Sequence, residues 1–300
     1  MPQHDCLIIG AGPAGLSAAT YLARYRRDVL CVESVPSRAA LIPASHNLAG
    51  YPDGISGASL LARMREQAAV HGVVPRQARV ESLRVIEGGF EASAGGELLH
   101  AARVILATGV VDQAPDFPGL RDATLAGVVR WCPICDGFEV LDQDVALLGP
   151  ARSTLGHALF LRTYTRSLTL VALTDSPGLD ADALARMESA GIELLVEPVV
   201  DARPGAGGGI ELSLAGGGRR RFDTLYPMQG CTVQNALALQ VGAACDDNGD
   251  VLVDAHQASS VAGLHAIGDV VSAINQIGVA FGHAAIAATA VHRSLPRNFR

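Results

Sequence analysis

Lysine is absent from this chain, and all 23 of its basic residues are arginine. Without a lysine amine the protein cannot form a Schiff base, and it lacks the lysine that a P-loop uses to bind phosphate. The net charge is −7 and the isoelectric point lies near 5.7, which argues against nucleic acid as the main partner. Amine catalysis, P-loop chemistry and nucleic-acid binding are therefore not expected.

The sequence also lacks an uncharged apolar run that is long enough to span a bilayer. The segment 278–291 comes nearest, but Gly282, His283 and Thr289 interrupt it, so a buried helix is the better interpretation. The first residues, Met1 to Asp5, show no signal-peptide pattern and run straight into an apolar strand. We therefore expect no membrane contact and a cytoplasmic location.

Cysteine is scarce, and only one close pair occurs. Six cysteines in 300 residues fit a reducing compartment better than a disulfide scaffold. The length suggests about two domains, and a hydrophobic content of 49% with 33 glycines indicates globular domains with many tight turns. Cys6 and Cys31 lie inside apolar strands, and we interpret them as ordinary core residues.

The close pair lies in Cys132-Pro133-Ile134-Cys135. Two thiols at this spacing at the start of a helix can close a small disulfide, and the helix N-terminus stabilises the thiolate that attacks disulfides. Pro133 suits the first helical turn, where an N–H has no partner within the helix. Asp136 follows directly, so its carboxylate can move the proton that thiol–disulfide exchange requires.

Two other interpretations of the pair are half of a zinc site and two small buried residues. Zinc needs two more ligands, and the sequence contains no second Cys-x-x-Cys and no His-x-x-x-His. We therefore predict redox chemistry at Cys132 and Cys135, and no metal site.

A glycine-rich turn near the N-terminus predicts a dinucleotide site. Gly10-Ala11-Gly12-Pro13-Ala14-Gly15 follows the apolar strand 6–9, and a helix over 16–25 and a strand over 29–32 come next. Gly10 makes the tight turn, Gly12 lets the backbone approach a pyrophosphate, and Gly15 lets the helix pack on the strand. The helix N-terminus faces the phosphates, and Glu33 is placed to accept ribose hydroxyls. The alternative is a glycine-rich turn without a ligand.

Two later strands end in residues that suit the same cofactor. The buried strand 104–106 runs into Ala107-Thr108-Gly109, a small-residue turn against which a cofactor can lie. A strand over 263–267 ends in Gly268-Asp269, before an alanine-rich helix. Asp269 is a candidate for binding flavin ribityl or phosphate-linked hydroxyls, and a helix N-cap is the alternative.

A second strand–turn–helix–strand unit begins at the strand 145–148, and its helix is expected to end near Tyr164. Ala151 stands where the fingerprint requires its middle glycine, and a methyl group there obstructs a pyrophosphate. The next strand, 168–173, runs into Thr174 and Asp175 with no arginine to receive a 2′-phosphate, which Asp175 would repel.

The rest of the chain predicts short elements joined by glycine turns. Helices are expected over 60–69 and 183–190, and strands over 78–86, 90–94, 98–100, 192–200, 210–214 and 250–254. The first three of these strands suit a small antiparallel meander. We interpret Arg219-Arg220-Arg221 as a solvated hairpin in preference to a phosphate or partner site.

In this order and spacing, the motifs resemble the low-molecular-weight thioredoxin reductase family of flavin disulfide oxidoreductases. The resemblance covers nearly the whole chain and is carried by Gly10 to Gly15 with Glu33, Ala107 to Gly109, Cys132 to Gly137, and Gly263 to Asp269 with Gln276. It implies an α/β fold with two Rossmann-like (three-layer ββα) domains. An FAD-binding domain over 1–112 and 243–300 is split by an inserted redox domain over 113–242. The resemblance also implies a homodimer.

The resemblance further implies roles for single residues. Cys135 faces the flavin, Cys132 attacks the substrate disulfide, and Asp136 is the acid or base. Asn47 is a flavin-side contact, and the segment 281–283 lies where the family's last helix starts near the isoalloxazine. The expected FAD-binding residues are Gly10, Gly12, Pro13, Ala14, Gly15, Glu33, Asn47, Ala107, Thr108, Gly109, Gly268, Asp269 and Gln276.

The chain departs from the family where NADPH binds. The family has a glycine-rich turn and, after the next strand, a His-Arg-Arg run, whereas this chain has Pro150-Ala151-Arg152 and Ala172-Leu173-Thr174. The arginine that usually precedes Gln276 is Asn275. Each charged hydrogen bond that is lost removes about 1.5–3 kcal/mol, so we expect NADPH affinity to fall by about two decades or more. The segment 131–139 also resembles relatives that do not use NADPH, of which some oxidise small dithiols with oxygen and others draw electrons from another protein.

Three functions remain open. The first is electron exchange between FAD, the cysteine pair and an external thioredoxin-like protein or small dithiol or disulfide, without a normal NADPH site and with a protein as a possible electron donor. The second is an NADPH-dependent thioredoxin reductase that binds the nucleotide through Arg152, Arg162 or Arg166. The third is a flavin-binding regulatory protein without turnover. The sequence leaves open the electron donor or acceptor (NADPH, NADH, a ferredoxin-like protein or oxygen), the direction of flow and any domain rotation. It also leaves open whether the tail 298–300 stacks on the flavin or trails in solvent, and trailing is the default expectation for a terminus.

Overall fold

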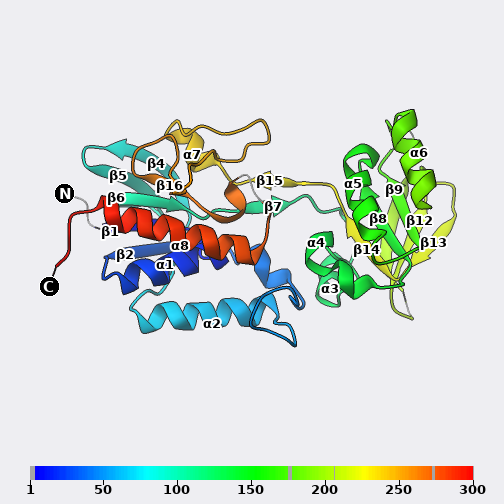
Figure 1. Ribbon diagram of the computed structural model, residues 1–300, viewed down its shortest axis with the longest axis horizontal. Coiled ribbons are helices and arrows are strands. Elements are labelled where there is room, and N and C mark those ends of the chain that lie inside the picture. Colours follow the sequence, from blue (N-terminus) through cyan, green and yellow to red (C-terminus); the bar gives the residue numbers. More distant parts are fainter. Residues whose placement is uncertain (1–3, 175–177, 206, 272–273, 300) are drawn as a thin grey trace. The chain divides into compact units, whose positions relative to one another are not determined.

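The computed structural model describes residues 4–174, 178–205, 207–271 and 274–299 (Figure 1). By its internal contacts the chain divides into two compact units. Unit 1 comprises residues 1–40, 56–111 and 232–300, and unit 2 comprises residues 41–55 and 112–231. Unit 2 is therefore inserted in the sequence of unit 1, and the predicted α/β class with Rossmann-like units is confirmed.

The limits of the units differ from the expected boundary at 242/243. Residues 232–242 belong to unit 1 because the helix α7 (Ala236–Gln240) packs on the strand β4 (Val80–Ile86). There the Gln240 side chain donates to the Glu81 carbonyl at 3.2 Å and accepts from the Leu83 N–H at 2.8 Å. The segment 41–55 belongs to unit 2.

Unit 1 is built on a seven-stranded mixed sheet in which β1 lies between β2 and β6. The strand order is β3 (Arg76–Gln77), β2 (Val29–Glu33), β1 (His4–Ile9), β6 (Glu97–Leu106), β5 (Gly89–Ala94) and β4, with β16 (Leu264–Ala266) paired to β6. The pairs that β1 forms with β2 and β6 are parallel, whereas β5 is antiparallel to both of its neighbours, β4 and β6. The parallel centre places the ends of β1, β6 and β16 at one edge.

Besides α7, this sheet is accompanied by the helices α1 (Pro13–Arg24), α2 (Gly57–Val70) and α8 (Ile277–Ser294) (Figure 1). The helix α1 packs on both of the others. Its neighbour α8 buries Ala280, Ala284, Ala287, Ala288 and Val291. Small side chains let two helices approach closely, so the alanine-rich sequence explains this packing. The helix α1 begins at Pro13, earlier than the predicted Leu16, because proline is well suited to the first helical position.

Two strand predictions in unit 1 are wrong. The predicted strand 98–100 and the apolar strand 104–106 are one continuous strand, β6, because the intervening residues keep pairing with β1 and β5. The segment 250–254 forms isolated bridges instead of a strand, because Val251 pairs with Cys245 and Val271 whereas Val253 pairs with Ser259.

Unit 2 has a four-stranded parallel sheet in the order β10 (Glu193–Leu195), β9 (Leu168–Ala172), β8 (Val145–Gly149) and β14 (Thr224–Pro227). The helices α5 (Ala151–Leu161) and α6 (Ala181–Ala190) pack with it, and α3 (Leu120–Leu125) and α4 (Pro133–Asp136) precede it. A separate antiparallel sheet contains β11 (Val199–Pro204), β12 (Ile210–Leu214) and β13 (Arg219–Phe222). The predicted strand 192–200 is thus two strands, because the chain changes sheets between them.

Two of the places where the chain passes between the units lie in β7 (Val110–Asp112) and β15 (Cys231–Val233), which pair with each other. Three 3₁₀ helices complete the described structure: η1 (Arg38–Leu41), η2 (Gly137–Val140) and η3 (Gly268–Val270). Among the described residues no helix is long and apolar enough to cross a membrane. The same residues include no cluster of three or more histidine, cysteine, aspartate or glutamate side chains that could hold a metal ion.

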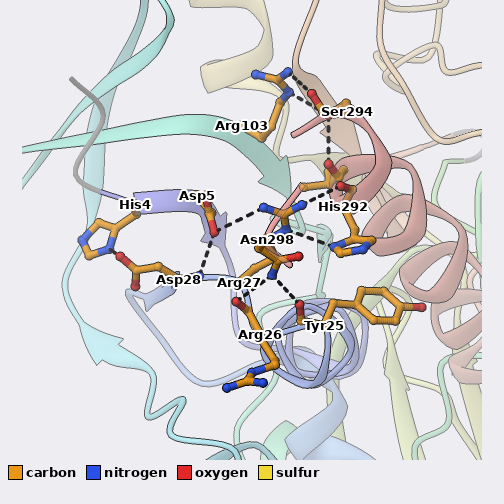
Figure 2. Close-up of polar contacts among 11 residues, drawn as sticks. His4, Asp5, Tyr25, Arg26, Arg27, Asp28, Arg103, His292, Ser294 and Asn298 are labelled. Atoms are coloured by element: carbon orange, nitrogen blue, oxygen red, sulfur yellow. Dashed lines mark hydrogen bonds and ion pairs between the residues drawn. The ribbon is translucent and has the colours of Figure 1, made fainter. Parts of the chain in front are cut away.

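The C-terminal segment is anchored on unit 1 (Figure 2). The Asn298 amide donates to the carbonyls of Tyr25 and Arg26 at 3.0 and 3.1 Å. Arg27 is only 8% exposed, and its Nε donates to His292 Nδ1 at 3.0 Å. The expectation of a trailing tail is therefore wrong at Asn298, whereas Phe299 is exposed and residue 300 lies outside the described part.

Candidate functional site

Cys132 and Cys135 are joined in a disulfide at the start of α4. Cys132 is the N-cap residue, its Sγ lies 3.2 Å from the Cys135 N–H, and Pro133 occupies the first helical turn. The proline and the cap explain why the chain turns into a helix between the two sulfurs. Ile134, one of the two residues between them, is exposed, so the side of α4 that carries it is open to solvent.

The remaining cysteines are not part of this site. Cys6 in β1 and Cys31 in β2 are buried, and burial raises the pKa of the Cys31 thiol to about 12. Burial likewise raises the pKa of Cys6 far above its ordinary value. Thiols in this state are inert, so the interpretation of both as core residues is confirmed. Cys231 is exposed on β15, and Cys245 is half-buried.

Asp136, the residue after the second sulfur, is held by two side chains. Tyr226 in β14 donates its hydroxyl to Asp136 Oδ1 at 2.8 Å, and Arg130 Nη1 donates to Asp136 Oδ2 at 3.1 Å. Burial raises the pKa of the Asp136 carboxyl, and the hydrogen bond from Tyr226 and the charge of Arg130 oppose that rise. The sequence did not predict Arg130 or Tyr226, because nothing local marks them as partners of Asp136.

A second polar pair lies in the same unit. Glu139 in η2 accepts from His46 Nδ1 at 2.9 Å. The segment with His46 also contains Asn47, whose Oδ1 accepts from the Ser45 hydroxyl at 3.0 Å. Asn47 is grouped with unit 2, whereas the other expected FAD-binding residues lie in unit 1.

The turn from β1 into α1 has the shape of a dinucleotide cradle. Gly10 has φ = +109°, and a Cβ there would overlap the Ala107 carbonyl oxygen. A Cβ on Gly15 would overlap the Gly10 carbonyl oxygen, so both positions require glycine for packing. Gly12 differs because a Cβ there would meet only Ser37, whose Oγ would lie 3.0 Å away. Its main chain is therefore open toward a ligand, as the fingerprint requires.

Two other predicted residues of unit 1, Ala107 and Gly268, lie against this turn. Gly268 in η3 has φ = +72°, and a Cβ there would lie 2.9 Å from the Ala14 methyl group. The Ala107 N–H donates to the Ile9 carbonyl at 2.8 Å, and Thr108 Oγ1 donates to the Gln234 carbonyl at 2.7 Å. The ends of β1, β6 and β16 thus meet at α1, whose first turn carries no side-chain cap. Uncapped N–H groups at a helix start suit phosphate oxygens.

Glu33 and Asp269 occupy the expected strand ends. Glu33 ends β2, where its carboxylate pairs with Arg65 Nη2 from α2 at 2.8 Å. Asp269 lies inside η3, whose N-cap residue is Ile267, so the N-cap interpretation of Asp269 is wrong. Gln276 is the N-cap residue of α8. Arg65 is a residue that sequence reasoning missed, since it comes from a helix about thirty positions later.

His283 lies one turn inside α8 and faces η3. Its Nδ1 accepts the Gly268 N–H at 3.3 Å, so the ring proton of the neutral form resides on Nε2. Burial lowers the pKa of His283, and the Asp269 carboxylate opposes this effect. The ring therefore fixes the Gly268 backbone beside α1. The dinucleotide cradle as a whole fits an FAD pyrophosphate.

The second glycine turn of the chain has a different shape. Only Pro150 separates β8 from α5, whereas Gly10, Ala11 and Gly12 separate β1 from α1. Proline has no N–H to offer a phosphate. Ala151 is 2% exposed and packs in the core of unit 2, so its methyl group does not project toward a ligand as the sequence suggested. The short turn is the stronger obstacle to a pyrophosphate.

The arginines that could bind NADPH are differently placed. Arg152 is exposed, with Asp180 at 3.9 Å. Arg162 donates to the carbonyls of Ala190 and Thr165 and is thereby committed to main-chain contacts. Asp175, which was expected to repel a 2′-phosphate, lies outside the described residues.

The arginine run of β13 forms hairpin contacts. Arg220 makes two hydrogen bonds of 2.8 Å to Glu193, and Arg219 contacts Glu211 at 3.1 Å. Arg221 donates to the carbonyls of Gly207 and Gly208. All three arginines are paired within unit 2, which supports the interpretation of a solvated hairpin.

Comparison with known proteins agrees with this geometry. A family model described as pyridine nucleotide-disulphide oxidoreductase matches residues 4–284. A thioredoxin reductase of Mycolicibacterium smegmatis is 37% identical over 57% of this chain and 56% of its own length. The chain thus spans about half the length of that curated relative. A thioredoxin reductase of Peptoclostridium acidaminophilum is 27% identical over 99% of this chain and 98% of its own length.

A solved structure supports the same fold. The thioredoxin reductase from Streptococcus pyogenes MGAS5005 superimposes with a TM-score of 0.88 and 25% identity, covering 97% of each chain. The crystal structure of an oxidoreductase from Agrobacterium tumefaciens gives a TM-score of 0.84 and 26% identity, covering 98% of each chain.

Proposed function

We propose, from the premise that this chain belongs to the pyridine nucleotide-disulphide oxidoreductase family, that it is an FAD-dependent disulfide oxidoreductase of the thioredoxin reductase type. The observation that carries the proposal is the closed Cys132–Cys135 disulfide at the start of α4, with the Asp136 carboxyl beside it. A dinucleotide cradle in the other unit supports it. The full-length likeness to a thioredoxin reductase agrees with the proposal.

The FAD would be held by the residues that line the cradle. The turn Gly10 to Gly15 would carry the pyrophosphate on the first turn of α1, and Glu33 would accept the ribose hydroxyls. The rest of the site would be lined by Ala107, Thr108, Gly109, Gly268, Asp269 and Gln276. When bound, FAD supplies a two-electron carrier. We further propose that the protein is a homodimer, which light scattering of the purified protein tests.

The two sulfurs would divide the work. Cys135 would exchange electrons with the flavin when FAD is bound, and Cys132 would form the mixed disulfide with an external partner. The exposed Ile134 leaves that side of α4 accessible to a thioredoxin-like protein or a small dithiol or disulfide. Asp136 gives or takes the proton that each exchange requires. A non-catalytic regulatory protein would have no need of a closed disulfide beside a buried carboxyl.

We also propose that NADPH is a poor electron donor. The connection from β8 to α5 is a single proline, Ala151 is buried, and Arg162 is committed to carbonyl groups. Each missing phosphate contact costs about 1.5–3 kcal/mol. The second candidate, an ordinary NADPH-dependent thioredoxin reductase, rests on the names of the relatives and on the exposed Arg152. Without NADPH, the electrons would come from a protein donor, or they would come from a dithiol substrate and pass to oxygen.

Anaerobic stopped-flow spectroscopy of the flavin decides between the two. The proposal predicts that dithiothreitol or a reduced thioredoxin-like protein bleaches the flavin, whereas micromolar NADPH does not. Rapid bleaching by micromolar NADPH would establish the second candidate. A protein in which Cys132→Ser leaves every activity unchanged would be the regulatory protein instead.

A further inference from the structure

Two side chains, Tyr226 and Arg130, form hydrogen bonds to the Asp136 carboxyl group. The proposed chemistry does not by itself require these hydrogen bonds. Tyr226 donates to Oδ1 at 2.8 Å and Arg130 donates to Oδ2 at 3.1 Å, so each carboxylate oxygen has a partner. Tyr226 is fully buried, and the side chains of Asp136 and Arg130 are 17% and 15% exposed. Interactions of a carboxylate in such surroundings are stronger than in water.

Backbone pairing fixes both partners to the same strand. Tyr226 pairs with Leu147 across β14 and β8, in the centre of unit 2. Val129 forms a bridge to Leu225, and the Arg130 N–H donates to the Leu225 carbonyl at 2.9 Å. This backbone pairing therefore keeps residues 130 and 226 close together, and both of their side chains donate to the Asp136 carboxylate.

The Tyr226 hydroxyl is needed for the hydrogen bond to Asp136 and not for filling the core. The Tyr226 ring packs in the apolar core of unit 2, where a phenylalanine would fill the same volume. A hydroxyl in a core is costly unless it is hydrogen-bonded, and its acceptors here are Oδ1 and, at 3.4 Å, the main-chain oxygen of Asp136. We therefore interpret the Tyr226 hydroxyl as a hydrogen-bond donor that orients the Asp136 carboxylate.

We propose that Tyr226 and Arg130 are positioning residues that hold the Asp136 carboxyl group ready to exchange a proton at the disulfide. This inference rests on the proposed function. In the step, an external thiol loses its proton to the Asp136 carboxylate and its sulfur bonds to Cys132 Sγ. The Cys132–Cys135 bond breaks, and Cys135 keeps the electron pair as a thiolate. The reverse reaction returns the proton to the departing sulfur.

Three neighbouring groups and burial together set the charge state of Asp136. Tyr226 from β14 and Arg130 before α4 favour the carboxylate, whereas burial and the charge of Glu139 from η2 disfavour it. Glu139 is itself paired with His46 at 2.9 Å. Removing the phenol or the guanidinium charge therefore moves the titration of Asp136 to higher pH. Because the carboxylate is the form that accepts the thiol proton, the acidic limb of the reaction moves in the same direction.

The test is the pH dependence of anaerobic flavin bleaching by dithiothreitol in the holoenzyme. Tyr226→Phe and Arg130→Gln should each move the acidic limb up by about one pH unit or more, whereas Arg130→Lys, which keeps the charge, should move it less. Tyr164→Phe is the matched control, because this ring lies against Gly137 next to the site, whereas the carboxyl oxygens are held by Tyr226 and Arg130. It should leave the limb in place. Asp136→Asn should abolish the limb, and adding Tyr226→Phe should then change nothing further.

A second readout does not depend on turnover. The rate at which iodoacetamide alkylates Cys132 in the reduced protein should follow the same shifted pH profile in Tyr226→Phe and Arg130→Gln. If Tyr226→Phe lowers the rate equally at every pH, the tyrosine is only structural and the inference is wrong. If Tyr226→Phe fails to fold, Arg130→Gln provides the same test. A wild-type protein that does not react with dithiols overturns the proposed function, while the alkylation profiles still decide the role of the pair.

Discussion

Gly12→Ala should remove FAD binding while leaving the fold intact. Gly12 has φ = −76°, which an alanine adopts without strain, and its Cβ would meet only the flexible Ser37 side chain, with Oγ at 3.0 Å. Replacing glycine by alanine at a helix N-cap costs no more than about 1 kcal/mol of stability. The methyl group would, however, stand where the pyrophosphate approaches the main chain. Loss of two charged hydrogen bonds, at about 1.5–3 kcal/mol each, weakens FAD binding by about two to four decades.

The assay compares the flavin content of the purified proteins, the FAD dissociation constant of the apoproteins and the apoprotein melting temperature. Gly156→Ala is the matched control, because this glycine lies in α5 and a Cβ there meets no atom within 4 Å. It should keep its FAD and gain roughly 0.5–1 kcal/mol of stability. Wild-type FAD affinity in Gly12→Ala would refute the role assigned to this glycine.

Three further substitutions each test the role of one residue. Cys132→Ser should retain a charge-transfer band between the Cys135 thiolate and the flavin, and a band found only in Cys135→Ser would reverse the assigned roles. Gly268→Ala should lower stability by about 1–3 kcal/mol in urea unfolding, because φ is +72° and the added Cβ lies 2.9 Å from Ala14; an unchanged midpoint would contradict this. Arg220→Gln should cost under about 1 kcal/mol, since the pair with Glu193 is 35% and 52% exposed. Arg220 lowers the pKa of Glu193, so the stability lost in Arg220→Gln is present above the unfolded-state pKa of Glu193 and disappears as the pH falls through its folded-state pKa. A loss of stability that grows in acid would exclude the Arg220–Glu193 pair as its cause.

The parts of the structure that short sequence patterns determine could be predicted. The strand, glycine turn, helix and second strand of residues 4–33 follow from steric demands within the segment, as the tight contact of Gly15 with the Gly10 carbonyl shows. The disulfide at α4 is equally local, because its spacing, proline and cap lie within five residues. Features that depend on a few neighbouring residues can therefore be predicted from the sequence without knowledge of the fold.

Contacts between distant segments could not be predicted. Asp136 meets Tyr226, ninety positions later, only because β14 pairs with β8. Glu33 meets Arg65 because α2 packs near the end of β2. The sequence likewise predicted that the methyl group of Ala151 faces a ligand, whereas the structure buries that group and leaves a turn of one residue between β8 and α5.

An anaerobic reductive titration of the purified protein tests the proposed flavin–disulfide couple most directly. We predict a yellow protein that accepts one two-electron equivalent for the flavin and a second for the Cys132–Cys135 disulfide. In Cys135→Ser only the flavin equivalent should remain. A colourless protein, or a wild-type protein that accepts no more electrons than Cys135→Ser, would contradict the proposed function.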